Sequence, residues 1–539
     1  MLGDMMPGAL TITSIMDFAR RVFPTTEIVS VTADNPRHRT TFGEAFDRAG
    51  KLANALAKLG LEQGDRIATL AWNDYRHFEL YYGISCSGYV CHTINPRLFP
   101  EQIVYIANHA EDQWVFVDPA FVPLLEQVQE QLQSVRGYVV LCSEASMPET
   151  GLANAQCYET LIAGESSDFA WPELDENSAS SLCYTSGTTG NPKGVLYSHR
   201  STVLHCLGTN AGDVLGLAPN EVIMPVVPMF HVNAWGTVYS AAVSGSKLVF
   251  PGPKMGDGET LAALVNEEQV TFALGVPTVW LAMVNYLDAN GASVPSFKKA
   301  VVGGAACPLS LMQSMDKYGV TIHVGWGMTE MSPLGTYNTL LPWMHDLPDE
   351  EKYNYRLKAG RLIYGVEMRI VDEDANELPW DGKSSGRLQV RGPWVCKSYY
   401  RMDKSDAHLP DGWFDTGDVA TIDQHGYMAI TDRTKDVIKS GGEWISSIDV
   451  ENAAMGHPDV AEAAVIGVPH PKWTERPLLI VVKRAGAEPS KDELLGYLDG
   501  KIAKWWIPED CVFVDEIPHT ATGKISKKDL RDEFSDYSY

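Results

Sequence analysis

Apolar and polar residues follow two regular patterns along most of the chain. Short apolar runs indicate buried strands, and longer segments with apolar residues three and four positions apart indicate amphipathic helices. The clearest helix begins at a capping box formed by Thr41 and Glu44, and Gly60 ends it. Strands are expected at residues 66–71, 114–117, 181–184, 247–250, 271–274, 300–302 and 321–324. Because helical patterns separate these runs, they predict parallel sheets of the α/β type.

The pattern changes near residue 400, where short strands and turns replace the alternation of apolar strands with amphipathic helices. A compact unit then follows, with apolar runs at 460–468, 478–482 and 511–514. We predict an α/β protein with a large N-terminal domain at 1–432, in which α/β sheets are joined by a β-rich subdomain. We also predict a hinge linker at 433–437, followed by a small, mobile α+β C-terminal domain at 438–539. The polar run DRTKD at 432–436 is typical of a solvated linker.

Size and charge narrow the class of protein. A chain of 539 residues predicts two or more domains. The 43 basic and 69 acidic residues give a net charge of −26, which argues against a nucleic-acid partner. No apolar run reaches the ~18 residues of a membrane span, and the N-terminus lacks a secretory pattern, so we expect a cytoplasmic protein. The 9 cysteines form no CxxC pair, which favours buried thiols over a zinc site.

The segment YTSGTTGNPKGV at 184–195 has the composition of a phosphate-binding loop. Its glycines let the backbone approach an anion closely, its hydroxyl groups can donate hydrogen bonds, and Lys193 adds a positive charge. Gly194 follows the lysine where a P-loop NTPase has Ser or Thr, so that class is excluded. The alternative is an ordinary polar loop. The predicted phosphate-binding residues are Thr185, Ser186, Gly187, Thr188, Thr189, Gly190 and Lys193.

This segment resembles the signature of the adenylate-forming superfamily, which contains acyl-CoA synthetases, luciferases and the adenylation domains of peptide synthetases. Further motifs of that superfamily follow in the same order, and the resemblance covers nearly the whole chain. They are VVGGAACP at 301–308, GWGMTEMSP at 325–333, GWFDTGDVA at 412–420, TDRTKDVIKSGGEWIS at 431–446 and IPHTATGKISKKDL at 517–530.

The resemblance implies a nucleotide site. The residues that would surround adenine and the phosphates include Gly304, Ala305, Trp326, Gly327 and Met328. By the same resemblance Asp418 binds the ribose hydroxyls and Arg433 donates to ribose or phosphate.

Three residues are implied to be catalytic. Thr329 would bind the α-phosphate, and Glu330 would hold Mg²⁺, since a carboxylate beside a phosphate needs a metal between them. Lys524 would bridge the substrate carboxylate and the α-phosphate, where negative charge must be neutralised in the transition state.

The resemblance also implies a domain motion and a second site. Lys435 would be the hinge about which the small domain rotates between two half-reactions. After the rotation, Gly441, Gly442, Glu443 and Trp444 would lie beside the pantetheine arm of coenzyme A.

The segment PMFHVNAWG at 228–236 resembles the acyl-pocket motif of the superfamily. His231, Trp235 and Gly303 would form the wall of that pocket. In the alternative interpretation, His231 and Trp235 are core residues on one face of a helix, because they are four positions apart. No acidic residue lies between Phe230 and Thr237 to pair with a substrate ammonium, which disfavours an amino acid as substrate.

The implied activity is that of an ATP-dependent, AMP-forming acyl-CoA ligase, with ATP, Mg²⁺ and coenzyme A as cofactors and co-substrates. The bulky pocket residues favour a short or medium acyl chain. The resemblance implies 3-methylmercaptopropionate, but a medium-chain fatty acid stays open, because a thioether is nearly isosteric with a methylene. Remoter alternatives are luciferase-type oxygenation and a non-catalytic nucleotide-binding protein. A homodimer would be in keeping with the superfamily.

Overall fold

The computed structural model describes residues 3–185, 191–440, 443–520, 524–537 and 539. Its first lobe is a seven-stranded sheet in which all neighbouring strands are parallel except the last pair. The order is β7 (Ala155–Cys157), β6 (Gly137–Val140), β5 (Trp114–Val117), β3 (Arg66–Leu70), β4 (Val90–Thr93), β8 (Ala179–Tyr184) and β9 (Gly194–Ser198). Helices of this lobe include α2 (Phe42–Ala57), α3 (Tyr75–Cys86), α4 (Pro100–Ala110) and α6 (Tyr158–Ala163).

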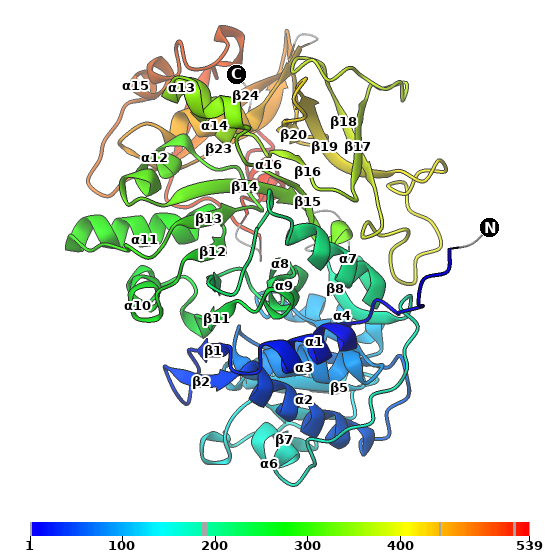
Figure 1. Cartoon of the computed structure of the whole chain (residues 1–539). Coiled ribbons are helices and arrows are strands. Elements are labelled where there is room, and N and C mark those ends of the chain that lie inside the picture. Colours follow the sequence, from blue (N-terminus) through cyan, green and yellow to red (C-terminus); the bar gives the residue numbers. More distant parts are fainter. Residues whose placement is uncertain (1–2, 186–190, 441–442, 521–523, 538) are drawn as a thin grey trace.

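The second lobe is a nine-stranded sheet with a parallel centre and antiparallel edges (Figure 1). Its order is β16 (Arg361–Leu362), β15 (Leu334–Tyr337), β14 (Thr321–Gly327), β13 (Lys299–Val302), β12 (Phe272–Gly275), β10 (Val222–Pro225), β11 (Lys247–Phe250), β1 (Glu27–Ser30) and β2 (His38–Thr41). Its helices include α10 (Gly258–Glu268), α11 (Pro277–Asn290) and α12 (Leu309–Lys317). Helices α1 (Ile12–Val22), α7 (His199–Thr209) and α9 (Thr237–Ser244) pack on one another.

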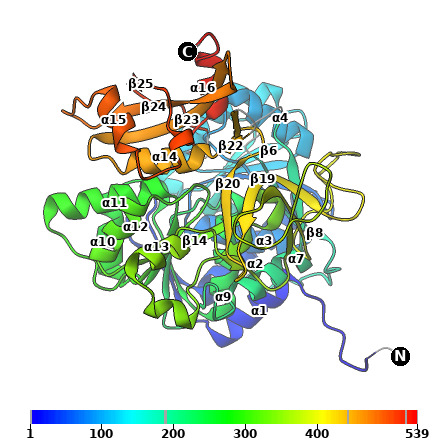
Figure 2. The same cartoon turned by 90° about the horizontal axis from the view of Figure 1, so that it is seen from above.

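Two smaller sheets follow in sequence. The first is antiparallel: β17 (Glu367–Val371), β18 (Ser385–Arg391), β19 (Phe414–Ile422) and β20 (Met428–Arg433). The second is built from β22 (Glu443–Ile445), β21 (Ile438–Ser440), β24 (Thr474–Lys483), β23 (Val460–His470) and β25 (Asp510–Val514), with helices α14 (Ser447–Met455), α15 (Lys491–Tyr497) and α16 (Lys527–Glu533). This C-terminal unit lies over one side of the larger part (Figure 2). The predicted fold class, mixed α/β sheets with a smaller C-terminal domain, is confirmed.

Local signals in the sequence account for many elements. The capping box forms as expected: the Thr41 hydroxyl accepts from the Glu44 N–H at 3.3 Å, and the Thr41 N–H donates to Glu44 Oε2 at 2.9 Å. The expected strands all occur with small shifts at their ends. Strand β14 runs three residues longer than expected, to Gly327, because β15 folds back and pairs with its end.

The predicted linker is wrong in one respect. Asp432 is 1% exposed rather than solvated, and its Oδ2 accepts hydrogen bonds from the N–H and the hydroxyl of Ser447, each at 2.7 Å. A buried carboxylate is tolerated when donors satisfy it, as they do here. Thr434 and Lys435 are exposed, as expected of a linker. The proposed domain bounds remain a prediction.

Two further expectations concern the whole chain. All nine cysteines are free, and all but Cys396 are buried, in agreement with the interpretation as structural thiols. Among the described residues, no helix has both the length and the apolar character that crossing a bilayer requires.

A buried group of charges joins α2, α3 and α6. Arg48 Nε donates to Glu79 at 2.7 Å, and its Nη2 pairs with Glu159 at 3.0 Å. The side chain of Glu79 is 0% exposed, and its other oxygen accepts from the Tyr158 hydroxyl at 2.7 Å. Burial raises the pKa of Glu79 to about 7, although Arg48 acts to lower it. The carboxylate therefore depends on the guanidinium for its charge balance.

Replacing Arg48 by alanine is expected to lower the free energy of unfolding by about 3–5 kcal/mol, because Glu79 would remain as an uncompensated buried acid. Urea denaturation followed by circular dichroism measures the loss. The matched control is Arg20→Ala, which breaks an ion pair with Asp47 whose side chains are 38% and 47% exposed, and which should cost less than about 1 kcal/mol. Equal losses in the two variants would contradict this account.

Candidate active site

The residues predicted to bind a nucleotide come from parts of the chain that are far apart in sequence. They lie in the loop after β8, at the end of β14, on strands β19 and β20, and just before α16. Side-chain contacts connect each of these segments to another, as the following paragraphs describe. The structure therefore brings them to one site between the lobes and the C-terminal domain.

The loop between β8 and β9 is closed at its base. The Thr185 N–H donates to the Lys193 carbonyl at 2.9 Å, and the Lys193 N–H donates to Thr185 Oγ1 at 3.2 Å. The strands that it joins are antiparallel, with Tyr184 opposite Gly194, so the loop caps a hairpin and does not begin a helix as a P-loop does. Ser186, Gly187, Thr188, Thr189 and Gly190 lie outside the described residues, and their role stays a prediction.

Thr329 and Glu330 form a single 3₁₀ turn (η5, Thr329–Met331) directly after β14, and they are 7% and 6% exposed. The Tyr197 hydroxyl donates to the Thr329 carbonyl at 2.6 Å, and the Cys396 N–H donates to the Glu330 carbonyl at 2.8 Å. The turn is therefore fixed from two other parts of the chain. Gly327 precedes it where a Cβ would lie 1.9 Å from the carbonyl oxygen of Pro333, so only glycine fits.

The carboxylate of Glu330 is buried and has a polar partner. The Tyr399 hydroxyl donates to its Oε1 at 2.7 Å. Burial raises the pKa of Glu330, while the hydrogen bond from Tyr399 and the charges of Arg433 and Lys193 act to lower it. Glu330 forms no ion pair within 4.0 Å among the residues that the structure describes. A cation from outside could therefore bind to it.

Asp418, Arg433 and Trp326 form a second polar group. Asp418 and Arg433 face each other on β19 and β20, and Arg433 Nε pairs with Asp418 Oδ1 at 2.7 Å. Trp326 Nε1 donates to Asp418 Oδ2 at 2.9 Å. The Asp418 side chain is 4% exposed and that of Arg433 is 43% exposed. The structure therefore joins three residues that the resemblance assigned to adenine, to ribose, and to ribose or phosphate.

Lys524 reaches this site from the C-terminal domain. Its Cε lies 3.8 Å from the Cβ position of Gly304, which follows β13 in the large part and has a φ of +79°. Ala305 beside Gly304 is exposed. Burial, with a smaller contribution from the charge of Arg433, lowers the pKa of Lys524 to about 8, although Asp418 and Glu330 act to raise it. The lysine is therefore within electrostatic reach of both carboxylates.

The segment with His231 and Trp235 differs from the helical face considered for it. Val232, Asn233, Ala234, Trp235 and Gly236 have φ values of 45°, 53°, 48°, 56° and 75°, so the chain makes a left-handed turn. This conformation is unfavourable for residues with a Cβ and needs support.

The side chain of Asn233 supplies that support. Its Nδ2 donates to Ser181 Oγ at 3.1 Å, and its Oδ1 accepts from the Tyr81 hydroxyl at 3.2 Å. The turn brings Trp235 against Gly303, where a Cβ would lie 2.8 Å from the indole ring.

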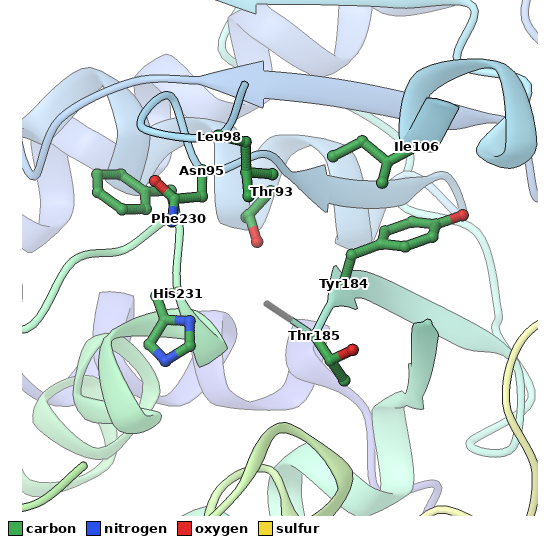
Figure 3. Close-up of a pocket in the computed structure, with 8 residues that line it drawn as sticks. All are labelled: Thr93, Asn95, Leu98, Ile106, Tyr184, Thr185, Phe230 and His231. Atoms are coloured by element: carbon green, nitrogen blue, oxygen red, sulfur yellow. The ribbon is translucent and has the colours of Figure 1, made fainter. Parts of the chain in front are cut away.

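A hollow adjoins the phosphate loop, as Figure 3 shows. The cavity between the end of β4, the end of β8 and His231 has a volume of about 10 Å³, which is room for about one water molecule. Its lining is mixed: Thr93, Asn95, Tyr184, Thr185 and His231 are polar, and Leu98, Ile106 and Phe230 are apolar. Burial, with a contribution from Lys524, lowers the pKa of His231 to about 4, so the imidazole is neutral at pH 7. His231 is therefore suited to form a wall rather than to act as an acid.

Some predicted residues are not tested by this geometry. Gly441 and Gly442 lie outside the described residues. Glu443 and Trp444 are in β22, paired with Ser440 and Lys439. Met328 lies in the extended segment before η5, and its N–H donates to the Pro333 carbonyl at 3.0 Å. Reasoning from the sequence missed Tyr197 and Tyr399, because a tyrosine outside a motif carries no signal of the group to which it will donate.

The fold is that of an adenylate-forming enzyme. The profile of the AMP-binding enzyme family matches residues 18–400, and that of the AMP-binding enzyme C-terminal domain matches residues 449–524. The chain belongs to this family of AMP-binding enzymes. Together with the CoA ligases to which the chain is similar, this confirms the prediction of an AMP-forming acid–thiol ligase.

Relatives cover the chain from end to end. It is 54% identical over 538 residues to the 3-methylmercaptopropionyl-CoA ligase of Ruegeria lacuscaerulensis, which covers 99% of each chain. It is 50% identical over 537 residues to the medium-chain-fatty-acid–CoA ligase of Ectopseudomonas oleovorans, covering 99% of this chain and 98% of that one. Among solved structures, an anthranilate CoA ligase in complex with anthranoyl-AMP has a TM-score of 0.86 and 25% identity, and covers 98% of both chains.

Proposed function

We propose that the chain is an ATP-dependent, AMP-forming 3-methylmercaptopropionyl-CoA ligase. The observation that carries this proposal is the position of Lys524, which reaches from the C-terminal domain to the group formed by Glu330, Asp418 and Arg433. A lysine there can neutralise charge where a carboxylate meets the α-phosphate of ATP. The 54% identity to a ligase of this name over the full length supports the choice of acid.

In the first half-reaction, a carboxylate oxygen of the acid forms a bond to the α-phosphorus of ATP, and the bond from that phosphorus to the bridging oxygen breaks. Pyrophosphate leaves and the acyl-adenylate remains. Asp418, oriented by Arg433 and Trp326, would accept hydrogen bonds from the ribose. Lys193 and Lys524 would hold the phosphate oxygens.

Magnesium fits the donor set. Glu330 offers a buried carboxylate without an ion pair in the described part of the chain, and hard oxygen donors are what Mg²⁺ prefers. Glu330 would hold the ion. When bound, Mg²⁺ would offset the charge of the ATP phosphates beside this carboxylate.

In the second half-reaction, the thiol sulfur of coenzyme A attacks the acyl carbon, its proton passes to solvent, and AMP leaves. Rotation of the C-terminal domain about Lys435 would withdraw Lys524 and bring Gly441, Gly442, Glu443 and Trp444 to the site.

The choice of acid follows from pocket size and from the relatives. Trp235 packs against Gly303 and restricts the space for an acyl chain. A short thioether acid would place its polarisable sulfur where a fatty acid has a methylene. Such an acid arises when dimethylsulfoniopropionate is broken down. A medium-chain fatty acid is the second candidate, because the chain is 50% identical to a ligase for those acids.

Release of AMP and pyrophosphate, measured with ATP, Mg²⁺, coenzyme A and a series of acids, tests the proposal. The series runs from propionate to decanoate and includes 3-methylmercaptopropionate. The expected result is a kcat/KM for the thioether acid at least about tenfold above that for hexanoate or octanoate. A higher value for octanoate would instead identify a medium-chain synthetase. No AMP with any acid, or AMP formation that ignores coenzyme A, would overturn the ligase assignment.

A further inference from the structure

Tyr399 links two motifs that are distant in sequence. It lies in the irregular segment between β18 and β19 and is 5% exposed. Its hydroxyl donates to Glu330 Oε1 at 2.7 Å, and the ammonium group of Lys193 lies over its ring, 4.8 Å from the ring centre. One side chain therefore contacts both the carboxylate proposed to hold Mg²⁺ and the lysine of the phosphate loop.

The backbone around Tyr399 is fixed to the same two places. The Cys396 N–H donates to the carbonyl oxygen of Glu330 at 2.8 Å, and the Tyr400 N–H donates to that of Gly194 at 2.8 Å. Gly194 is the residue directly after Lys193. Because both ends of this short segment are tied down, the ring has little freedom to move away from its two partners.

The two contacts have a common electrostatic effect. A hydrogen bond from a neutral hydroxyl favours the ionised form of a carboxylate, and the face of an aromatic ring attracts an ammonium ion. Tyr399 thus keeps an anion and a cation close to each other without a direct ion pair between them: no contact within 4.0 Å joins Lys193 to Glu330 in the described part of the chain. Each remains able to bind a ligand.

We propose that Tyr399 is a positioning residue for adenylation, which orients Glu330 toward Mg²⁺ through its hydroxyl and Lys193 toward the ATP phosphates through its ring. This inference rests on the proposed function and extends it to a residue outside the recognised motifs. Two substitutions separate the two contacts of this side chain. Tyr399→Phe would remove the hydrogen bond to Glu330 and keep the ring beside Lys193, whereas Tyr399→Leu would remove both contacts.

Isothermal titration of ATP into the full chain, over a range of free Mg²⁺ and in EDTA, tests the proposal. In Tyr399→Phe, the Mg²⁺ concentration that gives half of the gain in ATP affinity should be about tenfold higher than in the wild type, because the variant lacks a hydrogen bond to a charged group. In EDTA, its ATP affinity should equal that of the wild type. Tyr399→Leu should also bind ATP more weakly in EDTA. The matched control is Tyr400→Phe, whose ring packs against His109 instead, and it should behave as the wild type.

A double variant gives a readout that a purely structural role would not change. Glu330→Gln should lose the Mg²⁺ response, and adding Tyr399→Phe to it should cause no further change, because the hydroxyl would act through Glu330.

An unchanged Mg²⁺ response in Tyr399→Phe would overturn the proposal, as would independent, additive effects in the double variant or a wild type whose ATP affinity ignores Mg²⁺. Failure of the proposed function looks different: the wild type would form no acyl-adenylate with any acid, while the binding experiment would still give its result for Tyr399.

Discussion

Lys524→Ala should slow the formation of acyl-adenylate by about 10²- to 10³-fold, which is the usual cost of removing a charge-stabilising donor from a transition state. The reason is its position, since Lys524 is the group that the C-terminal domain contributes beside Gly304, Glu330 and Asp418. Pyrophosphate exchange in the absence of coenzyme A measures this step alone. The exposed Lys528, four residues further on, provides the control, and Lys528→Ala should change the rate by less than about twofold.

The same variant separates the two half-reactions. If the domain rotates as proposed, synthetic acyl-adenylate and coenzyme A should still react in Lys524→Ala at close to the wild-type rate. Equal loss in both steps would mean that the lysine maintains the fold rather than the adenylation chemistry.

The pH profile adds a check on the charge of Lys524. Burial lowers its pKa to about 8, so the ammonium form is present below that pH and is lost above it. If adenylation needs the cation, its kcat/KM, which reports the protonation state of the free enzyme, should therefore decline above about pH 8. In Lys524→Arg any residual rate should show no such decline, because a guanidinium stays protonated.

Asp418→Ala is expected to weaken ATP binding by at least about 30-fold, which corresponds to about 2 kcal/mol. It removes the acceptor for the ribose, and it also leaves Arg433 and the Trp326 N–H without their common partner. Equilibrium titration with ATP measures the effect. The control is Asp411→Ala on a surface ion pair with Arg369, in which the Asp411 side chain is 52% exposed, and its ATP affinity should stay within about twofold of the wild type.

Asp418→Asn refines this test. The amide keeps one oxygen as an acceptor but loses the charge that pairs with Arg433, so its affinity should lie between those of the wild type and the alanine variant. Wild-type ATP affinity in Asp418→Ala would refute the ribose role of this residue.

Much of the fold was predictable because its signals are local. The capping box at Thr41 and the apolar runs at Trp114–Val117 and Lys247–Phe250 are decided by neighbouring residues, and these elements formed as expected. The site was predictable where motifs name their residues, and so Trp326, Asp418 and Arg433 could be identified before their contacts were known.

The rest depended on partners far away in the chain. Of the four residues VNAW only Asn233 tolerates positive φ readily, and its side-chain bonds to Ser181 and Tyr81 support a left-handed turn that Val232 and Trp235 disfavour. Tyr399 was missed because its partner Glu330 is 69 residues earlier. Asp432 was expected in solvent because charged runs usually lie at the surface. Its burial depends on hydrogen bonds from Ser447, which is 15 residues further along the chain.

The burial of Asp432 has a consequence for timing. The carboxylate lies at the end of β20, where its Oδ1 accepts a hydrogen bond from the adjacent Arg433 N–H. Both donors to its Oδ2 come from Ser447 at the start of α14, beyond the exposed Lys435 in the sequence. Under the proposed rotation about Lys435, these bonds must break or be remade once in every catalytic cycle. These hydrogen bonds would stabilise the orientation of the C-terminal domain in which adenylation occurs, and so lengthen the time that the protein spends in it. The acyl-adenylate would then accumulate on the protein before the thiol arrives, and throughput would be set by the release of one carboxylate rather than by bond chemistry.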